Sequence, residues 1–188
     1  MIANKAIVFM CGFGFLVTAC APSQADFIDW MDDRENGPWQ KLEAEHFIYW
    51  LQYRPLSYQA LVQTQDPDTY HELVNSASGM EYYYLSLLAR DPQFTFPSPG
   101  SPMRGLLESN YGYEAIRLEI GERQLIPAEY YYEPSYNLRP EAGMLLAFNV
   151  GEEPAENRTL RIIGPFDQEE RALEITLKKI EDIPNFKL

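Results

Sequence analysis

Apolar and polar residues alternate in the second half of the chain, and this alternation predicts short β-strands. Ile116, Leu118 and Ile120 alternate with charged residues, so a strand here has one apolar face and one polar face. Further strands are predicted over residues 129–132, 144–150, 159–163 and 173–178. Glycine, proline and acidic residues between them are typical of turns. Several short strands at this spacing favour a β-sandwich.

The first half of the chain combines apolar runs with a helical pattern. Residues 47–53 are apolar on both alternating faces, which is typical of a central strand, and residues 80–89 form a second apolar run that also fits a helix. Between them, Ser57 can cap a short helix, and Asp66-Pro67 can begin another. The apolar residues of this second helix recur at helical spacing, at Tyr70, Leu73, Val74 and Ala77. The predicted fold class is α+β, mostly β: an antiparallel β-sandwich with a small helical insertion near residues 57–78.

A proline-rich segment lies between residues 91 and 105. Its four prolines predict a loop, because proline cannot donate a backbone hydrogen bond to a helix or a sheet. The segment would divide the chain if each side could fold alone, but residues 39–90 are too few for a good independent core. Residues 39–188 are therefore predicted to form a single β-rich domain, with the loop of residues 91–105 crossing its surface.

The first nineteen residues have the pattern of a secretory signal. Lys5 is the only charged residue before Asp26, and an apolar run follows it from Ala6 to Leu16. The stretch from Ala6 to Ala19 is shorter than the roughly 20 residues that a membrane-spanning helix needs. Cleavage at another small residue, as in an ordinary secreted protein, is the alternative, since Ala19-Cys20-Ala21 also fits a signal-peptidase site.

The end of this signal, Val17-Thr18-Ala19-Cys20, resembles the lipobox of bacterial lipoproteins. The resemblance implies that residues 1–19 are a signal peptide and that Cys20 becomes the first mature residue and carries palmitate or related acyl chains. Several such chains are required for stable membrane attachment. Ala21 takes the place of the aspartate that favours retention at the inner membrane in enteric bacteria. The resemblance thus implies a lipid-anchored protein of the outer membrane in a bacterial cell envelope.

Residues 20–38 are predicted to be the lipidated cysteine and an acidic tether. Fully extended, the part of this segment after the cysteine could reach on the order of 60 Å. Three apolar residues in it have helical spacing and allow a short amphipathic turn: Phe27, Trp30 and Met31. The acidic residues Asp29, Asp32, Asp33 and Glu35 lack the spacing of a calcium loop, so they are expected to be solvated.

Charge and cysteine content exclude several classes of function. The chain has a net charge of −13 at pH 7, which repels nucleic acid and anionic lipid headgroups. Its two cysteines are Cys11, inside the predicted signal, and Cys20, at the predicted lipidation site. No disulfide is therefore expected in the mature protein, and its fold has to depend on apolar packing.

No catalytic or metal-binding motif is complete. His71-Glu72 begins the H-E-x-x-H pattern of zinc proteases, but Asn75 replaces the second histidine, and His46 is the only other histidine. A serine nucleophile would need His46 or His71 as its base. We expect no cofactor, no metal and no catalysis. A concave site that joins His46 or His71 to carboxylates would favour an enzyme instead.

Tyrosine is unusually frequent and forms two matching tetrads, Glu81-Tyr82-Tyr83-Tyr84 and Glu129-Tyr130-Tyr131-Tyr132. In a strand, the outer two tyrosines of each tetrad share one face. Exposed tyrosines stack on sugars or anchor protein partners, so the candidate binding residues are Tyr82, Tyr84, Tyr130 and Tyr132. The alternative is that they fill the β core and form hydrogen bonds at its edge.

Two functions follow from these patterns. The first is a non-catalytic outer-membrane lipoprotein that binds another envelope protein as an accessory component of an envelope assembly. The second is a glycan-binding lipoprotein that uses the exposed tyrosines. Nucleic acid is not expected as a partner of either.

Overall fold

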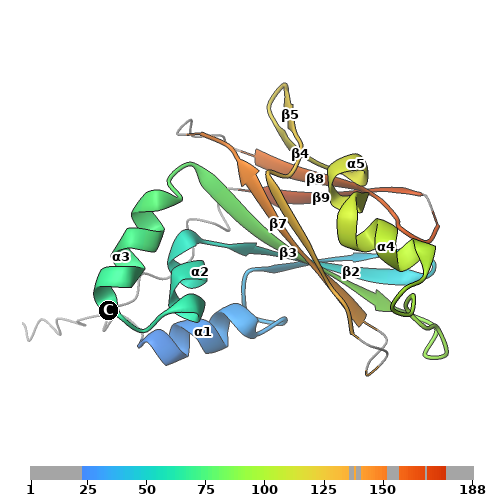
Figure 1. Cartoon of the computed structure of the whole chain (residues 1–188), viewed down its shortest axis with the longest axis horizontal. Coiled ribbons are helices and arrows are strands. Elements are labelled where there is room, and N and C mark those ends of the chain that lie inside the picture. Colours follow the sequence, from blue (N-terminus) through green and yellow to red (C-terminus); the bar gives the residue numbers. More distant parts are fainter. Residues whose placement is uncertain (1–22, 136–137, 139–140, 152–156, 168, 177–188) are drawn as a thin grey trace, which may run out of the picture.

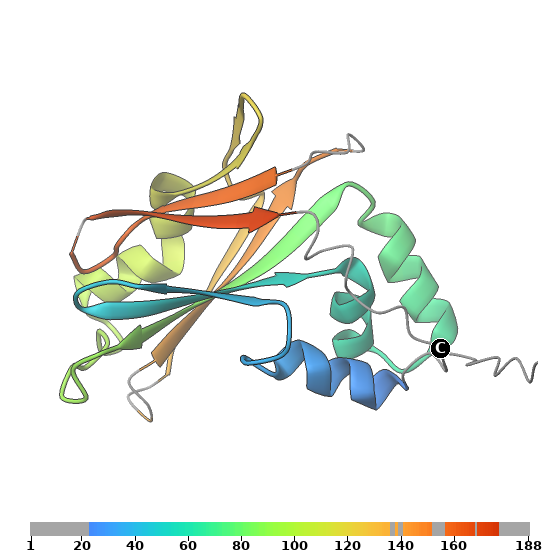
Figure 2. The same ribbon diagram turned by 180° about the vertical axis from the view of Figure 1, so that it is seen from behind.

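The strands form two antiparallel sheets with helices packed around them (Figures 1 and 2). The computed structural model describes residues 23–135, 138, 141–151, 157–167 and 169–176. The fold is mixed α+β with more strand than helix, and it resembles a sandwich, as the sequence predicts. The signal peptide of residues 1–19 and the lipidation of Cys20 lie outside the described residues and stay predictions.

The larger sheet has five strands in the order β1-β2-β3-β7-β6, and β3 is its central strand. Tyr83, Leu85 and Leu87 of β3 belong to the core between the sheets. Tyr84 and Ser86 are buried on the opposite face. Both faces of β3 are thus covered, which explains an apolar run without alternation. The strands are β1 (Trp39–Glu43), β2 (Phe47–Arg54), β3 (Met80–Ala89), β6 (Glu129–Glu133) and β7 (Glu141–Asn149).

The smaller sheet has four strands in the order β5-β4-β8-β9. The alternation in β4 is confirmed, because Ile116, Leu118 and Ile120 are buried while Arg117 and Glu119 are partly exposed. A tight turn at Gly121, whose φ of +57° lies in the left-handed region, joins β4 to β5. The strands are β4 (Ile116–Ile120), β5 (Arg123–Leu125), β8 (Asn157–Ile163) and β9 (Glu170–Thr176).

One hydrophobic core lies between the sheets and contains residues from both sides of the proline-rich segment. β3 precedes this segment and β7 follows it, yet the two strands pair from Met80 with Asn149 to Leu88 with Glu141. The core includes large side chains of both sheets: Tyr49, Tyr83, Leu85, Met144, Phe148, Leu118, Leu160 and Ile162. Burial of this apolar surface is the dominant stabilising contribution.

The helical insertion between β2 and β3 consists of α2 (Leu56–Gln63) and α3 (Pro67–Ser76). The predicted start of α3 is confirmed: the Asp66 carboxylate accepts a hydrogen bond from the backbone N–H of Thr69 at 2.8 Å, and Pro67 lies in the first turn. The first helix begins slightly earlier than expected, with Pro55 rather than a serine as its N-cap.

The predicted tether is wrong for residues 24–38, because most of this segment folds onto the domain. Residues Gln24–Asp32 form helix α1, which begins with a capping box at Ser23. Phe27 and Met31 have no exposed surface. They form a second, smaller core with residues of α2 and α3: Tyr58, Ala60, Leu61 and Tyr70. Asp26, Asp29 and Asp32 are exposed on the same helix, and Asp33 and Glu35 follow its end.

Polar contacts also attach this N-terminal segment to the larger sheet. The backbone carbonyl of Met31 accepts hydrogen bonds from the Trp39 indole at 2.9 Å and from the Gln52 side-chain amide. After α1, the Arg34 guanidinium forms an ion pair with Glu141 of β7 and lies 5.1 Å from the centre of the Trp39 ring. The segment is therefore an integral part of the fold.

Two further helices, α4 (Pro102–Ser109) and α5 (Tyr111–Ala115), connect the larger sheet to the smaller one. The predicted loop of residues 91–105 is therefore wrong from Pro102 onward. The Ser101 hydroxyl accepts a hydrogen bond from a first-turn backbone N–H at 3.2 Å, and proline in the first turn loses no helical hydrogen bond. The same arrangement of cap and proline begins α3.

Candidate functional site

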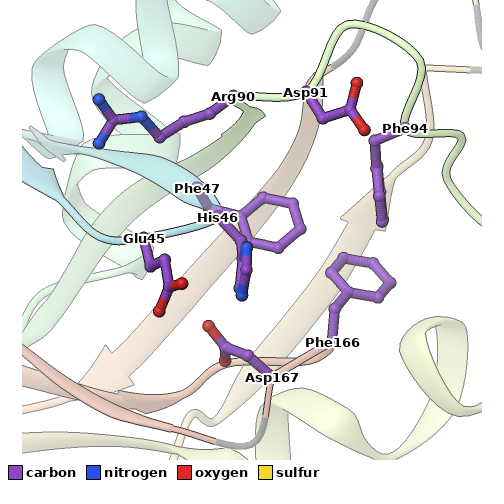
Figure 3. A pocket seen from close by; sticks show the side chains of 8 residues that line it. All are labelled: Glu45, His46, Phe47, Arg90, Asp91, Phe94, Phe166 and Asp167. Atoms are coloured by element: carbon purple, nitrogen blue, oxygen red, sulfur yellow. The ribbon is translucent and has the colours of Figure 1, made fainter.

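A cavity of about 510 Å³ is lined by residues of three turns (Figure 3), and these turns lie at the end of the sandwich opposite α1, α2 and α3 (Figure 1). Three turns that are distant in sequence meet there: the β1–β2 turn, the segment after β3 and the β8–β9 turn. We call this the end cavity, and its lining residues are Glu45, His46, Phe47, Arg90, Asp91, Phe94, Phe166 and Asp167. Its volume is within the range of about 300–1,000 Å³ that is usual for ligand pockets.

Phenylalanine rings form the apolar wall of the end cavity. Phe47, Phe94 and Phe166 contact one another with ring centres 5.2 to 5.4 Å apart, and Phe96 packs 5.2 Å from Phe94 behind them. Such distances are favourable for aromatic pairs. Phe47 and Phe96 are buried, whereas Phe94 and Phe166 are partly exposed. The cavity thus offers two accessible aromatic rings on a rigid aromatic base.

A turn after β3 places Phe94 in this wall. The Asp91 side chain accepts a hydrogen bond from the backbone N–H of Gln93 at 2.8 Å, and the backbone carbonyl of Asp91 accepts one from the N–H of Phe94 at 3.0 Å. Aspartate favours such a turn because its carboxylate can satisfy a nearby backbone donor. The prolines that follow keep the chain out of regular structure and over the end of the sheets.

Ionisable groups form the rim of the end cavity. The Asp167 carboxylate accepts hydrogen bonds from Arg171 at 3.1 Å and from the backbone N–H of Glu169 at 3.2 Å. A hydrogen bond from Arg171 lowers the pKa of Glu169 below its ordinary value. Arg90 donates to the backbone carbonyl of Ala44 at 3.0 Å. Both arginines at this end of the molecule therefore already have acceptors within the protein.

A buried tyrosine lies next to the rim. Tyr49 has no exposed surface, and burial, together with the nearby charge of Asp167, raises the pKa of Tyr49 to about 12. Within the part of the chain that the structure describes, its hydroxyl has no hydrogen-bond partner. Gly164 makes room for these groups, because a Cβ there would overlap Asp167 and lie 3.1 Å from the tyrosine hydroxyl.

His46 points into the end cavity between the carboxylates of Glu45 and Asp167 (Figure 3). This is the concave site with a histidine and carboxylates that would favour an enzyme. The eight lining residues include no serine, threonine, cysteine or lysine, but histidine and carboxylates are themselves residue types that act in acid–base and nucleophilic catalysis. His71 lies elsewhere, exposed on α3 with its ring 5.3 Å from that of Tyr70.

Two of the four candidate tyrosines are buried and cannot stack on a ligand. Tyr84 donates a hydrogen bond to Glu133 at 2.9 Å and lies beneath the Arg54 guanidinium, 4.2 Å from the ring centre. Tyr132 packs in the core between the sheets with Arg104 5.2 Å from its ring centre. Tyr132 is thus buried on the face of the larger sheet toward the smaller sheet, and Tyr84 is buried on the opposite face.

Of the other two candidates, Tyr82 lies in a small hollow on the outer side of the larger sheet, whereas the Tyr130 ring packs against the core between the sheets and Tyr130 only borders this hollow. We call it the tyrosine hollow; its volume is about 110 Å³, and its lining residues are Tyr82, Glu129, Tyr130, Tyr131, Leu145 and Ala147. Burial and the nearby Glu129 carboxylate raise the pKa of Tyr82. Tyr131 is 63% exposed and is the most accessible ring of the two tetrads.

Tyr131 is a functional candidate that the sequence prediction misses. The two tetrads have opposite orientations: the middle tyrosine faces the core in β3, whereas the outer two face it in β6. Tyr131 shares one face of the strand with Glu129 and Glu133, and two carboxylates on a face indicate the solvent side of a strand. This pattern was a usable signal in the sequence. All three residues of this face are exposed in the structure.

Among the described residues, no group of three histidine, cysteine or acidic side chains is placed to hold a metal ion. No helix in the same part of the chain is long and apolar enough to cross a bilayer.

Comparisons with known proteins return no match. Neither a protein-family model, nor a curated protein, nor a solved structure matches this chain. The end cavity and the tyrosine hollow are therefore the basis on which a function can be proposed.

Proposed function

We propose that this protein is a non-catalytic lipoprotein of the bacterial outer membrane that binds another envelope protein through the end cavity. The Val17-Thr18-Ala19-Cys20 motif supports the anchor, with palmitate or related chains on Cys20. The partly exposed phenylalanines beside charged groups support recognition of a partner, since aromatic residues are enriched at protein interfaces. The net charge of −13 argues against a nucleic-acid partner.

The location of the end cavity is the observation that carries this proposal. Helix α1 begins only four residues after Cys20, at the outer tip of the helical end formed by α1, α2 and α3 (Figures 1 and 2). The end cavity lies at the opposite end. An anchor at Cys20 would hold the helical end against the bilayer and turn the cavity away from it, toward other envelope proteins.

The anchor is tested in the native bacterium with radiolabelled palmitate. Mature protein should carry the label, and globomycin, which blocks the lipoprotein signal peptidase, should make the larger precursor accumulate. Cys20→Ser should abolish the label. An unlabelled wild-type protein would overturn the proposed anchor.

The partner site is tested by cross-linking in the same cells. A photoreactive phenylalanine analogue at Phe94, in the cavity wall, should give a discrete cross-linked product with one envelope protein. The same analogue at the exposed Val62 of α2, at the helical end, is the matched control and should not give that product. An identical set of products at both positions would show that the cavity is not the binding surface.

Glycan binding is the second candidate, and the tyrosine hollow favours it. Tyr82 and Tyr131 stand on either side of Leu145 and Ala147, with the Glu129 carboxylate available as a hydrogen-bond acceptor. Tyr131→Ala should abolish retention on a glycan array or on cell-wall material. The same change should leave the cross-link from Phe94 intact. Wild-type protein that no glycan retains would exclude this function.

A further inference from the structure

We infer that the end cavity recognises a peptide segment of a protein partner in which a basic residue stands beside an aromatic or large aliphatic residue. This inference rests on the proposed function and adds the chemistry of the partner. Three features of the cavity carry it: the accessible phenylalanines, the excess of carboxylates, and the occupied hydrogen bonds of the neighbouring arginines.

The apolar part of the peptide would contact Phe94 and Phe166. Both rings are partly exposed, and both are fixed in place by Phe47, with ring centres 5.2 and 5.4 Å away. A rigid aromatic wall loses little conformational entropy when a ligand binds to it. A cavity of about 510 Å³ has room for a pair of side chains rather than for a folded domain.

The basic residue would meet an excess of negative charge. Five carboxylates lie on or next to the rim: Glu43, Glu45, Asp91, Asp167 and Glu169. Three cations oppose them, namely Arg90, Arg171 and Lys41, which forms an ion pair with Glu43, so the net charge is −2 with His46 neutral. A positive group here would also be attracted by the faces of the phenylalanine rings. An acidic or phosphorylated segment would be repelled.

The two arginines are not free to recruit an anion instead. Arg171 bonds to Asp167 at 3.1 Å and to Glu169, so its charge is balanced within the β8–β9 turn. Arg90 bonds to the Ala44 carbonyl at 3.0 Å and lies 4.0 Å from Glu43. Glu45 and Asp91, by contrast, are exposed carboxylates at the cavity. They are the groups best placed to pair with an incoming cation.

The test uses the mature protein as purified from the native bacterium in a non-ionic detergent, and four blocked peptides that differ at two positions. The peptides contain Phe-Arg, Phe-Gln, Phe-Glu or Gly-Arg between glycines, and calorimetry measures the dissociation constant of each. We expect Phe-Arg to bind about tenfold more tightly than the other three, because each of them lacks either the ion pair or the aromatic contact, and a tenfold change corresponds to about 1.4 kcal/mol. Added salt should weaken the Phe-Arg peptide most.

Matched charge variants locate the site. Glu45→Gln with Asp91→Asn removes two carboxylates from the cavity, and Asp91→Asn keeps the oxygen that accepts from Gln93. Asp68→Asn with Glu72→Gln removes two exposed carboxylates from α3 at the other end of the molecule. The first pair should weaken Phe-Arg binding about tenfold, and the second pair should change it less than about twofold. Phe94→Ala should raise the dissociation constant of the Phe-Arg peptide to that of the Gly-Arg peptide.

The outcomes separate this inference from the proposed function. Equal binding of Phe-Gln and Phe-Arg, no binding of any peptide, or equal effects of the two charge pairs would overturn the inference. So would equally tight binding of spermidine, because the cavity would then take free polyamines. The palmitate label and the Phe94 cross-link would be unaffected by these results. Failure of the label would instead overturn the anchor and leave the peptide measurements standing.

Discussion

Tyr131 and Tyr132 are neighbours in β6, but their side chains lie on opposite faces of the sheet. Tyr131 is 63% exposed, and Tyr132 is 2% exposed in the core. Tyr132→Ala should lower the free energy of unfolding by about 3–5 kcal/mol, because it leaves a cavity where an aromatic ring was packed. Tyr131→Ala should change it by less than about 0.5 kcal/mol. Urea denaturation followed by circular dichroism measures both.

Comparing Tyr131→Ala with Tyr132→Ala also separates effects on ligand binding from effects on folding at the two tyrosine tetrads. If Tyr131→Ala destabilised the protein as much as Tyr132→Ala, the exposed face of β6 would have to be covered by something. Replacing all four of Tyr82, Tyr84, Tyr130 and Tyr132 should unfold the domain, since two of them are core residues. Tyr131→Ala is therefore the variant that can report on ligand binding alone.

A buried ion pair joins the two sheets and should be among the most sensitive single contacts. Arg158 of β8 and Glu81 of β3 are 4% and 12% exposed, and the guanidinium contacts the carboxylate at 2.7, 3.0 and 3.1 Å. The hydroxyl of Tyr83 donates to the same carboxylate at 2.5 Å. Glu81→Gln should lower the free energy of unfolding by about 3 kcal/mol, because a neutral amide cannot replace the buried ion pair or its charge-assisted hydrogen bonds.

The same strand offers a matched control for this prediction. Arg161 of β8 pairs with Glu119 at 2.8 Å, but both side chains are partly exposed to water. Glu119→Gln should therefore lower the free energy of unfolding by at most about 1 kcal/mol. Chemical denaturation of the two variants in one buffer gives the comparison. Similar losses in both would mean that the inter-sheet pair is as well hydrated as the surface pair.

At the scale of elements, α1 is the clearest departure from the sequence prediction, and its contribution can be measured. Phe27→Ala should lower the free energy of unfolding by about 3–5 kcal/mol, because Phe27 is fully buried among α1, α2 and α3. Asp29→Ala, on the exposed face of the same helix, should change it by less than about 0.5 kcal/mol. A solvated tether would make both substitutions neutral.

Local sequence patterns predict most helices and strands of this fold. They fail where two patterns in the same segment favour different structures. The alternation in β4 and the Asp66-Pro67 start of α3 are decided by neighbouring residues, so the sequence is sufficient for them. The acidic residues of α1 suggest a solvated segment, although Phe27 and Met31 mark a buried stripe. At α4, Pro102 suggests that no helix forms. Because it follows the N-cap Ser101, however, it occupies the first turn of the helix, where proline is favourable.

The end cavity could not be predicted from the sequence for a different reason. Its wall and rim come from turns around residues 45, 91 and 167, which meet only because β1, β2, β3, β8 and β9 all end at the same side of the sandwich. No local pattern reports such a meeting. The tyrosines were a visible signal, but the face on which each one lies depends on the register of β3 and β6 with β7.

At the scale of the whole molecule, the packing of α1 shortens the distance between the proposed anchor and the domain. Three residues separate Cys20 from the start of α1, so this connection spans at most about 14 Å. From the sequence alone, a fully extended tether from Ala21 to Pro38 was expected to span about 60 Å. With the short connection, the domain would lie close to the membrane with a defined orientation, the helical end nearest the lipid and the end cavity farthest from it.

This orientation predicts a difference in energy transfer between two ends of the lipidated protein. Mature protein cleaved before Cys20 would have no free thiol, so a single added cysteine can carry a donor dye. Asp68→Cys places the donor on the exposed side of α3 at the helical end, and Gln93→Cys places it beside the end cavity. With an acceptor dye on the lipid headgroups of a supported bilayer, transfer should be clearly more efficient from position 68 than from position 93. Removal of the lipid from both variants by Cys20→Ser should abolish transfer and serves as the control. Equal transfer from the two positions in the lipidated protein would mean that the domain tumbles on a long tether, and the membrane-distal location of the cavity would have to be abandoned.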